Sequence, residues 1–285
     1  MRSEGNDRED RELTGRVALV TGASRGVGRG IAHELGLAGA TVFVTGRSRE
    51  EGESTEGLPG TVDGTARLVT DAGGRGVPVV CDHTVDGDVE RLADRLREEA
   101  GRLDLLVNNV WGGYEDYDPE LWQLPFWEQP VWRWDKMWET GVRAHYLTAR
   151  ATAPLLLESD RPLIVEISAG DDGEFLGDVQ YDLAKAACSR LGFALAEALD
   201  DEGVTSLTVW PGFTRTERVE AAADEATLEG THSPRFVGRA VAALASDSDV
   251  MERSGGAYKV GHLARDYGFR DVDGSLPEPW SLPDG

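Results

Sequence analysis

The stretch VALVTGASRGVGRGIAHEL, residues 17–35, decides the fold of this chain. Its start, Val17–Val20, is apolar and typical of a short strand, and apolar residues at helical spacing follow in Ile31–Leu35. A glycine-rich turn, residues 21–28, therefore joins a strand to a helix. Glycines let a ligand approach the backbone, and a helix N-terminus attracts phosphate. We expect a dinucleotide-binding turn, with a plain strand-to-helix turn as the alternative.

The composition excludes several classes of protein. The chain has 285 residues, of which 40% are hydrophobic, enough for one large α/β domain or two small ones. No apolar run approaches the roughly 18 residues that span a bilayer, and the charged N-terminus is unlike a secretory signal. A net charge of −23 argues against nucleic acids and anionic membranes as partners. Cys81 and Cys188 give no disulfide framework, so we expect a cytoplasmic protein, and we assign no metal site.

Strand-like and helical segments alternate along the chain with short connections. We expect strands at 17–21, 41–45, 77–81, 103–108, 163–168, 205–210 and 256–260, and helices at 27–38, 62–72, 85–100, 134–158, 181–200 and 235–245. This alternation predicts an α/β fold, a doubly wound parallel sheet with helices on both faces. Pro78 suggests an edge position or a strand start. We place this single domain at 14–274, between a disordered tail at 1–13 and an extended tail at 275–285.

Two polar side chains at the start of a predicted helix form a candidate acid–base pair. Tyr181 and Lys185 lie four residues apart and share one helix face. A tyrosine has a pKa of about 10, and a neighbouring ammonium lowers that pKa. Ser168 ends the preceding strand, at the sheet edge where ligands bind. A serine that binds a carbonyl and a tyrosine that protonates it would suit carbonyl reduction. An exposed surface pair and a turn-capping serine are the alternatives.

Taken together, these motifs resemble those of the short-chain dehydrogenase/reductase family over residues 14–265. The matches are Thr21-Gly22-xxx-Gly26-x-Gly28 to the TGxxxGxG cofactor loop, Asn108-Asn109 to the NNAG motif, Ser168 and Tyr181-xxx-Lys185 to the catalytic residues, and Pro211-Gly212 with Thr216 to the PG motif. Within the family, the stretches 126–134, 141–146 and 263–268 resemble the branch of dehydrogenase/reductase member 1.

The resemblance implies an NAD(P)-dependent oxidoreductase on a Rossmann-type domain with a seven-stranded sheet, forming a homodimer or homotetramer. It makes Tyr181 the general acid in reduction and the base in oxidation, with Lys185 lowering its pKa and holding the nicotinamide ribose. Ser168 would orient the carbonyl. Asp82 would contact the adenine, Asn109 the adjoining ribose and Thr216 the carboxamide. The expected cofactor-binding residues are Gly22, Ser24, Arg25, Gly26, Val27, Gly28, Arg47, Asp82, Asn109, Tyr181, Lys185, Pro211, Gly212 and Thr216.

Two departures from the family pattern lie near the expected site. The NNAG motif reads Asn108-Asn109-Val110-Trp111-Gly112, so bulky side chains stand where the family has alanine and glycine. The fourth catalytic residue of the family, an asparagine in the helix after the fourth strand, is Gly141. The proton relay must therefore run through another group, through water alone, or not at all.

The residues after the second strand favour NADP over NAD. NAD-preferring sites usually carry a carboxylate there, whereas this chain reads Thr45-Gly46-Arg47-Ser48, with no carboxylate at hand. Arg47 can pair with a 2′-phosphate through a bidentate fork, and Arg25 supplies a second cation. The alternative is that Arg47 stacks on the adenine. Glu50 and Glu51 would oppose a phosphate if they faced inward.

An aromatic segment, residues 111–138, holds most of the eight tryptophans and follows the fourth strand beside the expected site. It would form a wall or lid suited to a bulky apolar carbonyl compound. Alternatively, it packs between subunits or in the core. The pocket residues we predict are Trp111, Tyr114, Trp122, Phe126 and Trp127.

These observations predict an NADP(H)-dependent oxidoreductase whose small-molecule substrate is an apolar carbonyl compound or the corresponding alcohol. Two other readings stay open: an NADP(H)-binding redox sensor with little turnover, and non-redox chemistry on the same fold, such as dehydration or epimerisation. A pure binder needs only the glycine turn and Lys185, so the presence of Ser168 and Tyr181 favours catalysis.

Overall fold

The structure, a computed structural model, describes residues 11–52, 54, 57–116, 118–170 and 172–282. Most of the predicted N-terminal tail, residues 1–10, lies outside this range. Leu13 is buried, and the Arg11 guanidinium donates hydrogen bonds to the carbonyl oxygens of Leu37 and Ala72. The packed domain therefore includes residues that we had placed in the tail before residue 14.

A seven-stranded parallel sheet forms the centre of the molecule, in the order β3-β2-β1-β4-β5-β6-β7, which confirms the predicted fold class. The strands are β1 (Val17–Val20), β2 (Thr41–Gly46), β3 (Arg75–Val80), β4 (Leu105–Asn108), β5 (Leu163–Ile167), β6 (Thr205–Trp210) and β7 (Ala257–Lys259). Pro78 lies on β3, an edge strand, as a residue without an N–H group requires. The strand order reverses between β1 and β4, and ligands bind at such a switch point.

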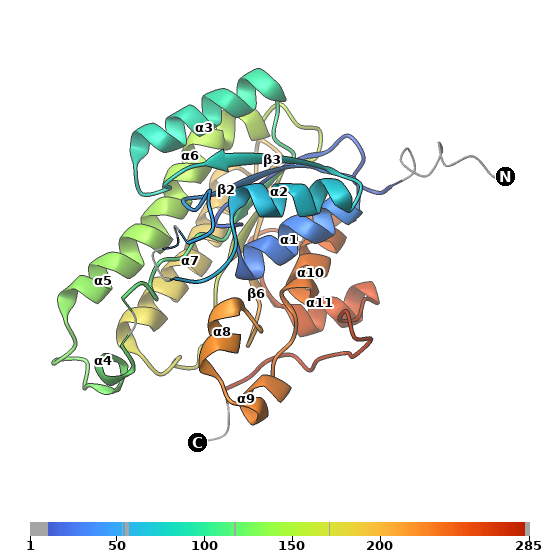
Figure 1. Cartoon of the computed structure of the whole chain (residues 1–285). Helices are drawn as coiled ribbons and strands as arrows, with labels where there is room; N and C mark the ends of the chain where they lie inside the picture. Colours follow the sequence, from blue (N-terminus) through green and yellow to red (C-terminus); the bar gives the residue numbers. More distant parts are fainter. Residues whose placement is uncertain (1–10, 53, 55–56, 117, 171, 283–285) are drawn as a thin grey trace.

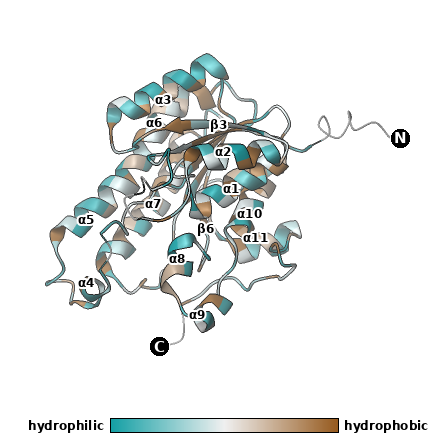
Figure 2. Cartoon of the chain, in the orientation of Figure 1, coloured by the Kyte–Doolittle hydropathy of each residue, from teal (hydrophilic) through white to brown (hydrophobic). Residues whose placement is uncertain are grey.

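Helices cover both faces of the sheet (Figure 1). The helices in the described part of the chain are α1 (Gly26–Leu37), α2 (Val62–Asp71), α3 (Asp86–Glu99), α4 (Pro119–Gln123), α5 (Val131–Met137), α6 (Ala144–Leu156), α7 (Val179–Ala198), α8 (Glu217–Ala222), α9 (Glu225–Glu229), α10 (Pro234–Ser246) and α11 (Val260–Tyr267), of which α4, α8 and α9 lie away from the sheet faces in Figure 1. One core joins the sheet to α1, α10 and α11, and the other joins it to α3 and α6. On α3 only Val89, Leu92, Ala93 and Leu96 are buried, and Figure 2 shows hydrophilic residues beside hydrophobic ones on this ribbon.

The helix that we predicted at 134–158 is divided into three parts. A π-helical turn, Trp138–Arg143, separates α5 from α6. Such turns interrupt α-helices, frequently at functional sites. This one contains Gly141, and a side chain there would collide with the Trp111 ring. The short helices α4, α8, α9 and α11 were not predicted, because so few residues carry little periodic signal.

The C-terminal segment, residues 275–282, forms neither helix nor strand and packs back on the domain. Figure 1 shows it running from α11 toward α8 and α9. Pro279 lies against Gly261, and the Trp280 side chain lies against Gly212. Trp280 and Leu282 line the main cavity, so the tail that we had separated from the domain forms part of its site.

Candidate active site

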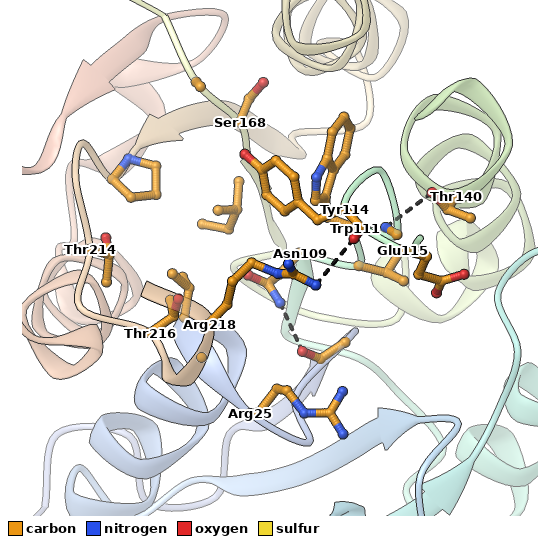
Figure 3. A pocket seen from close by; sticks show the side chains of 18 of the residues that line it. Arg25, Asn109, Trp111, Tyr114, Glu115, Thr140, Ser168, Thr214, Thr216 and Arg218 are labelled. Atoms are coloured by element: carbon orange, nitrogen blue, oxygen red, sulfur yellow. Dashed lines mark hydrogen bonds between the residues drawn. The ribbon is translucent and has the colours of Figure 1, made fainter. Parts of the chain in front are cut away.

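A cavity of about 580 Å³ opens at the carboxyl edge of the sheet (Figure 3). This volume is typical of small-molecule and cofactor sites. The ends of β1, β2, β4, β5 and β6 meet there with the start of α7 and the loop before α8. Almost every predicted cofactor and catalytic residue lines it. Gly28 does not: it lies behind the wall, where a Cβ would come within 2.5 Å of the Asn109 side-chain nitrogen.

The glycine turn is held against the end of β4. The register Val20↔Val107 places the two strand ends side by side. The Asn109 side-chain amide donates to the carbonyl oxygens of Thr21 (2.9 Å) and Gly22 (3.1 Å). Gly22 has φ +62°, and a Cβ there would lie 2.8 Å from the Val110 Cα. Only glycine fits this turn, because both its backbone angle and its neighbour exclude a side chain.

An acidic group already lies at the N-terminus of α1. A Glu217 carboxylate oxygen accepts a hydrogen bond from the Gly26 N–H at 2.8 Å. Gly26 has φ +55°, and its missing Cβ would contact only the Thr216 and Glu217 side chains. Helix N-termini attract anions through their unpaired N–H groups and their dipole. The N-terminus of α1 therefore fits a cofactor phosphate, and the Glu217 carboxylate binds there in place of such an anion.

Tyr181 lies near the start of α7 among aromatic rings. The Asp178 carboxylate caps the helix by accepting from the Tyr181 N–H at 2.8 Å. The Tyr181 ring stacks on Tyr114 (6.1 Å between centroids) and meets Trp111 edge-on (5.7 Å). Burial raises the pKa of Tyr181, and a side-chain hydrogen bond with Tyr114 acts in the opposite direction. The pKa of Tyr181 is therefore shifted upward overall, because burial outweighs the hydrogen bond, and the expected lowering effect of Lys185 stays a prediction.

Lys185 lies one turn further along α7, with its ammonium over the Trp111 ring. Its Nζ is 3.5 Å from the centroid of that ring and 5.7 Å from the centroid of Tyr181. Burial lowers the pKa of Lys185 to about 8, against an opposing effect of Cys188. The Ser168 hydroxyl donates to the Lys185 carbonyl oxygen at 2.7 Å, which ties the end of β5 to α7. All three predicted catalytic side chains thus line one wall of the cavity.

The end of β2 differs from our expectation. We expected no carboxylate there, but buried Glu115, from the segment after β4, forms an ion pair with Arg47. The same carboxylate accepts from the Lys136 ammonium at 2.6 Å. Burial would raise the pKa of Glu115, but its bonds to Arg47 and Lys136 lower it. Sequence reasoning missed Glu115 because no local pattern links residues so far apart in the chain.

Arg25 lies on the other side of the same region. Its guanidinium donates to the Ser48 hydroxyl and to the Gly60 carbonyl oxygen, both at 3.1 Å. These bonds place a cation beside the end of β2, as the sequence predicts. Asp82, after β3, accepts from the Thr84 N–H and hydroxyl. Although burial opposes it, these two bonds lower the pKa of Asp82.

The loop after β6 supplies a further wall of the cavity. Pro211, Gly212 and Thr216 all line it, as predicted. Gly212 has φ +80°, which favours glycine, and it faces Trp280. Thr216 caps α8 by accepting from the Val219 N–H. Arg218, which the sequence analysis did not single out, donates to the Tyr114 carbonyl oxygen at 3.1 Å and points into the cavity in Figure 3.

The aromatic segment divides into two groups. Trp111, Tyr114 and Trp122 line the cavity, as predicted. Phe126 and Trp127 do not, and they are 59% and 71% exposed, so assigning them to the pocket was wrong. They lie in the connection between α4 and α5, and their rings contact each other. Helical spacing could not show that Phe126 and Trp127 lie outside the pocket, because the prolines on either side interrupt the helical pattern.

The glycine turn and the tyrosine–lysine pair, both at one cavity of a doubly wound sheet, define a nucleotide-dependent oxidoreductase. A family model described as "short chain dehydrogenase" matches residues 16–227. The chain therefore belongs to the short-chain dehydrogenase/reductase family, whose members use NAD or NADP, act on small molecules and often form oligomers. It is similar to Dehydrogenase/reductase SDR family member 1 of Mus musculus, with 38% identity over 276 residues, 92% of this chain and 85% of that protein. This similarity confirms the branch that the sequence suggested.

Solved structures share this fold. A short-chain dehydrogenase of Mycobacterium thermoresistibile superposes with a TM-score of 0.80 over 96% of both chains, at 23% identity. A metagenomic short-chain oxidoreductase in complex with NADP superposes with a TM-score of 0.66, over 84% of this chain and 94% of that one, at 28% identity. Within the described residues, no helix is both long and apolar enough to cross a membrane.

Proposed function

We propose that this protein is an NADP(H)-dependent oxidoreductase that interconverts a carbonyl compound and its alcohol. One observation carries the proposal: Ser168, Tyr181 and Lys185 line the same cavity as the glycine turn. A dinucleotide on the N-terminus of α1 would extend along the strand ends toward these side chains. The bound nicotinamide would supply the hydride.

Tyr181, Lys185 and Ser168 each have a separate role in the proposed reaction. The Tyr181 hydroxyl donates a proton to the carbonyl oxygen during reduction and takes it back during oxidation. Its raised pKa keeps it protonated at neutral pH, which suits the acid role. The Lys185 ammonium stabilises the phenolate that forms when Tyr181 gives up its proton. Ser168 would orient the substrate by turning its hydroxyl hydrogen from the Lys185 carbonyl oxygen, which accepts it in this structure, to the carbonyl oxygen of the substrate.

The arginines near β2 support NADP as the preferred cofactor. Arg25 and Arg47 both line the cavity at the end where the adenosine would lie. Guanidinium groups bind phosphate through paired hydrogen bonds. The Glu115 carboxylate holds the Arg47 guanidinium in position and offsets part of its positive charge. In this proposal, Arg25 therefore makes the larger contribution to binding the 2′-phosphate. The NADP complex of the metagenomic relative is consistent with this choice.

The aromatic wall supports an apolar substrate. Trp111, Tyr114 and Trp122 surround Tyr181, and Trp280 closes the cavity from the C-terminal segment. Aromatic linings favour bulky apolar ligands that bury their surface. We therefore propose a ketone, aldehyde or quinone with an apolar body. The predicted homodimer or homotetramer and the cytoplasmic location stay predictions.

The test is the oxidation of NADPH in the presence of a panel of ketones, aldehydes and quinones. Tyr181→Phe should abolish turnover and leave NADPH binding close to that of the wild type, because only the proton donor is lost. Tyr146→Phe, which changes an exposed tyrosine on α6, is the matched control. Turnover by Tyr181→Phe at the wild-type rate would rule out this mechanism.

A further inference from the structure

The Trp111 indole occupies the volume that a side chain at position 141 would need. An ideal Cβ on Gly141 would lie 2.7 Å from Cζ3 and 2.9 Å from Cε3 of Trp111. On another side of the ring, a Cβ on Gly113 would lie 2.5 Å from its Cζ2. Contacts this short are prohibitive in a close-packed interior. Trp111 in its present place and a side chain at 141 therefore exclude each other.

The face of the same indole covers the Lys185 ammonium. The Nζ lies 3.5 Å from the ring centroid, and the Lys185 side chain is buried. Among the described residues, no carboxylate forms an ion pair with this lysine, whereas Lys136 and Lys259 both have one. Tryptophan is the best aromatic partner for a cation, and the attraction strengthens away from water. The ring face thus supplies the attraction that a carboxylate supplies to the other two lysines.

We propose that Trp111 is a positioning residue of the active site: its indole takes the volume of a side chain at position 141, and its face holds the Lys185 ammonium. The proposal rests on the function proposed above, because it concerns the lysine that supports Tyr181. Residue 141 then has no part in moving protons, and the Trp111–Gly141 pair works as a unit. Replacing one member without the other disturbs Lys185.

The protonation of Lys185 depends on a small set of neighbours. Tyr181 and Cys188 lie on its own helix, and Tyr114 stacks on Tyr181 from the segment after β4. The buried His145–Glu166 pair, from α6 and β5, contacts Cys188. Trp111 is the group that covers the ammonium itself. The same indole also contacts the rings of Tyr114 and Tyr181.

A direct test reads the pKa of Lys185 by NMR, with ¹³C at the lysine Cε. The chain has only three lysines, so Lys136→Arg and Lys259→Arg assign the signals. Trp111→Leu keeps an apolar side chain but removes the ring face. The pKa of Lys185 should fall by about half a unit to one and a half units in this variant. Trp127→Leu, which removes an exposed tryptophan, is the matched control and should leave the pKa unchanged.

The pairing of positions 111 and 141 is tested by a double-mutant cycle on NADPH-linked turnover. Gly141→Asn should lose most of its turnover, because the new side chain displaces the indole. Trp111→Ala should lose turnover to a similar extent, because it removes the ring face from Lys185. Adding Gly141→Asn to Trp111→Ala should cost little more, because no indole remains to be displaced. Thermal midpoints and circular dichroism identify any variant that does not fold, and such a variant is replaced by Gly141→Ala in the cycle.

The outcomes separate this proposal from the proposed function. An unchanged or raised Lys185 pKa in Trp111→Leu would overturn the role of the ring face. If the effects of the substitutions at positions 111 and 141 on turnover simply add, the proposed coupling between these two positions is wrong. If the wild type oxidises no NADPH with any carbonyl compound, the proposed function fails, but the lysine titration still decides the role of Trp111.

Discussion

At the scale of single residues, Lys185 has the environment with the clearest consequence. Its ammonium is buried against a ring face, and this burial lowers its pKa to about 8. The charge is therefore present below this pH and is lost as the pH rises through it. Because the charged form stabilises the Tyr181 phenolate, kcat/KM for reduction should fall above about pH 8. A pH profile of the wild type and of Lys185→Met measures this, and the alkaline fall should be absent from the variant.

In the proposed function, side chains at the end of β2 decide between NADP and NAD. Arg47→Ala should weaken NADPH binding more than NADH binding, by roughly tenfold to a hundredfold if a charge-assisted bond is lost. Glu115→Gln should strengthen NADPH binding, because the carboxylate that competes with the phosphate for the Arg47 guanidinium is then removed. Fluorescence titration measures both, with Arg49→Ala as the control, since that exposed residue pairs with Asp63. Equal losses for NADPH and NADH would remove Arg47 from phosphate recognition.

The sequence could predict that Ser168, Tyr181 and Lys185 share one cavity, because strand ends and helix starts of a parallel sheet meet at one edge. It could not predict the direction of the Tyr181 pKa shift. That direction depends on burial by Tyr114 and Trp111, which come from a different segment. The sequence did not predict the role of Glu115 for the same reason, because its ion pair with Arg47 joins segments that are far apart in the chain.

At the scale of elements, the first turn of α8 lines the cavity beside the glycine turn. Glu217, its first residue, occupies the Gly26 N–H that a phosphate would use. Glu217→Gln should therefore tighten NADPH binding by severalfold, because a neutral amide competes less well for a helix N-terminus. Equilibrium titration with NADPH measures the change. Glu220→Gln, on the exposed side of the same helix, should bind like the wild type, and tightening in both variants would contradict the competition.

The long strands and helices were predictable because buried residues recur with a regular period. The division of the segment 134–158 was not, since both halves continue the helical pattern, and the contact between Trp111 and Gly141 in the π-helical turn joins segments apart in the sequence. The aromatic segment illustrates the same limit. Its composition predicted a wall of the cavity, but the contacts alone show that Trp122 belongs to the wall and Trp127 does not.

At the scale of the whole molecule, the C-terminal segment completes the cavity from the far end of the chain. Trp280 lies against Gly212 and lines the pocket. Trp280→Ala should raise the KM for an apolar carbonyl compound severalfold, because less apolar surface is buried on binding. Steady-state kinetics measure this, with Trp127→Ala as the matched control. An unchanged KM would show that the segment does not contact the substrate.

The net charge of −23 gives the molecule a field that repels an anionic cofactor, so the local cations Arg25 and Arg47 matter more than they would in a neutral protein. The central claim remains hydride transfer between the cofactor and a carbonyl carbon. It is tested most directly by running the reduction with NADPH that carries deuterium at both C4 positions of the nicotinamide, so that the transferred hydride is labelled whichever face of the ring it leaves. The account predicts deuterium on the former carbonyl carbon of the alcohol, and no such product from Tyr181→Phe. An alcohol without the label, or labelled alcohol formed equally fast by Tyr181→Phe, would contradict it.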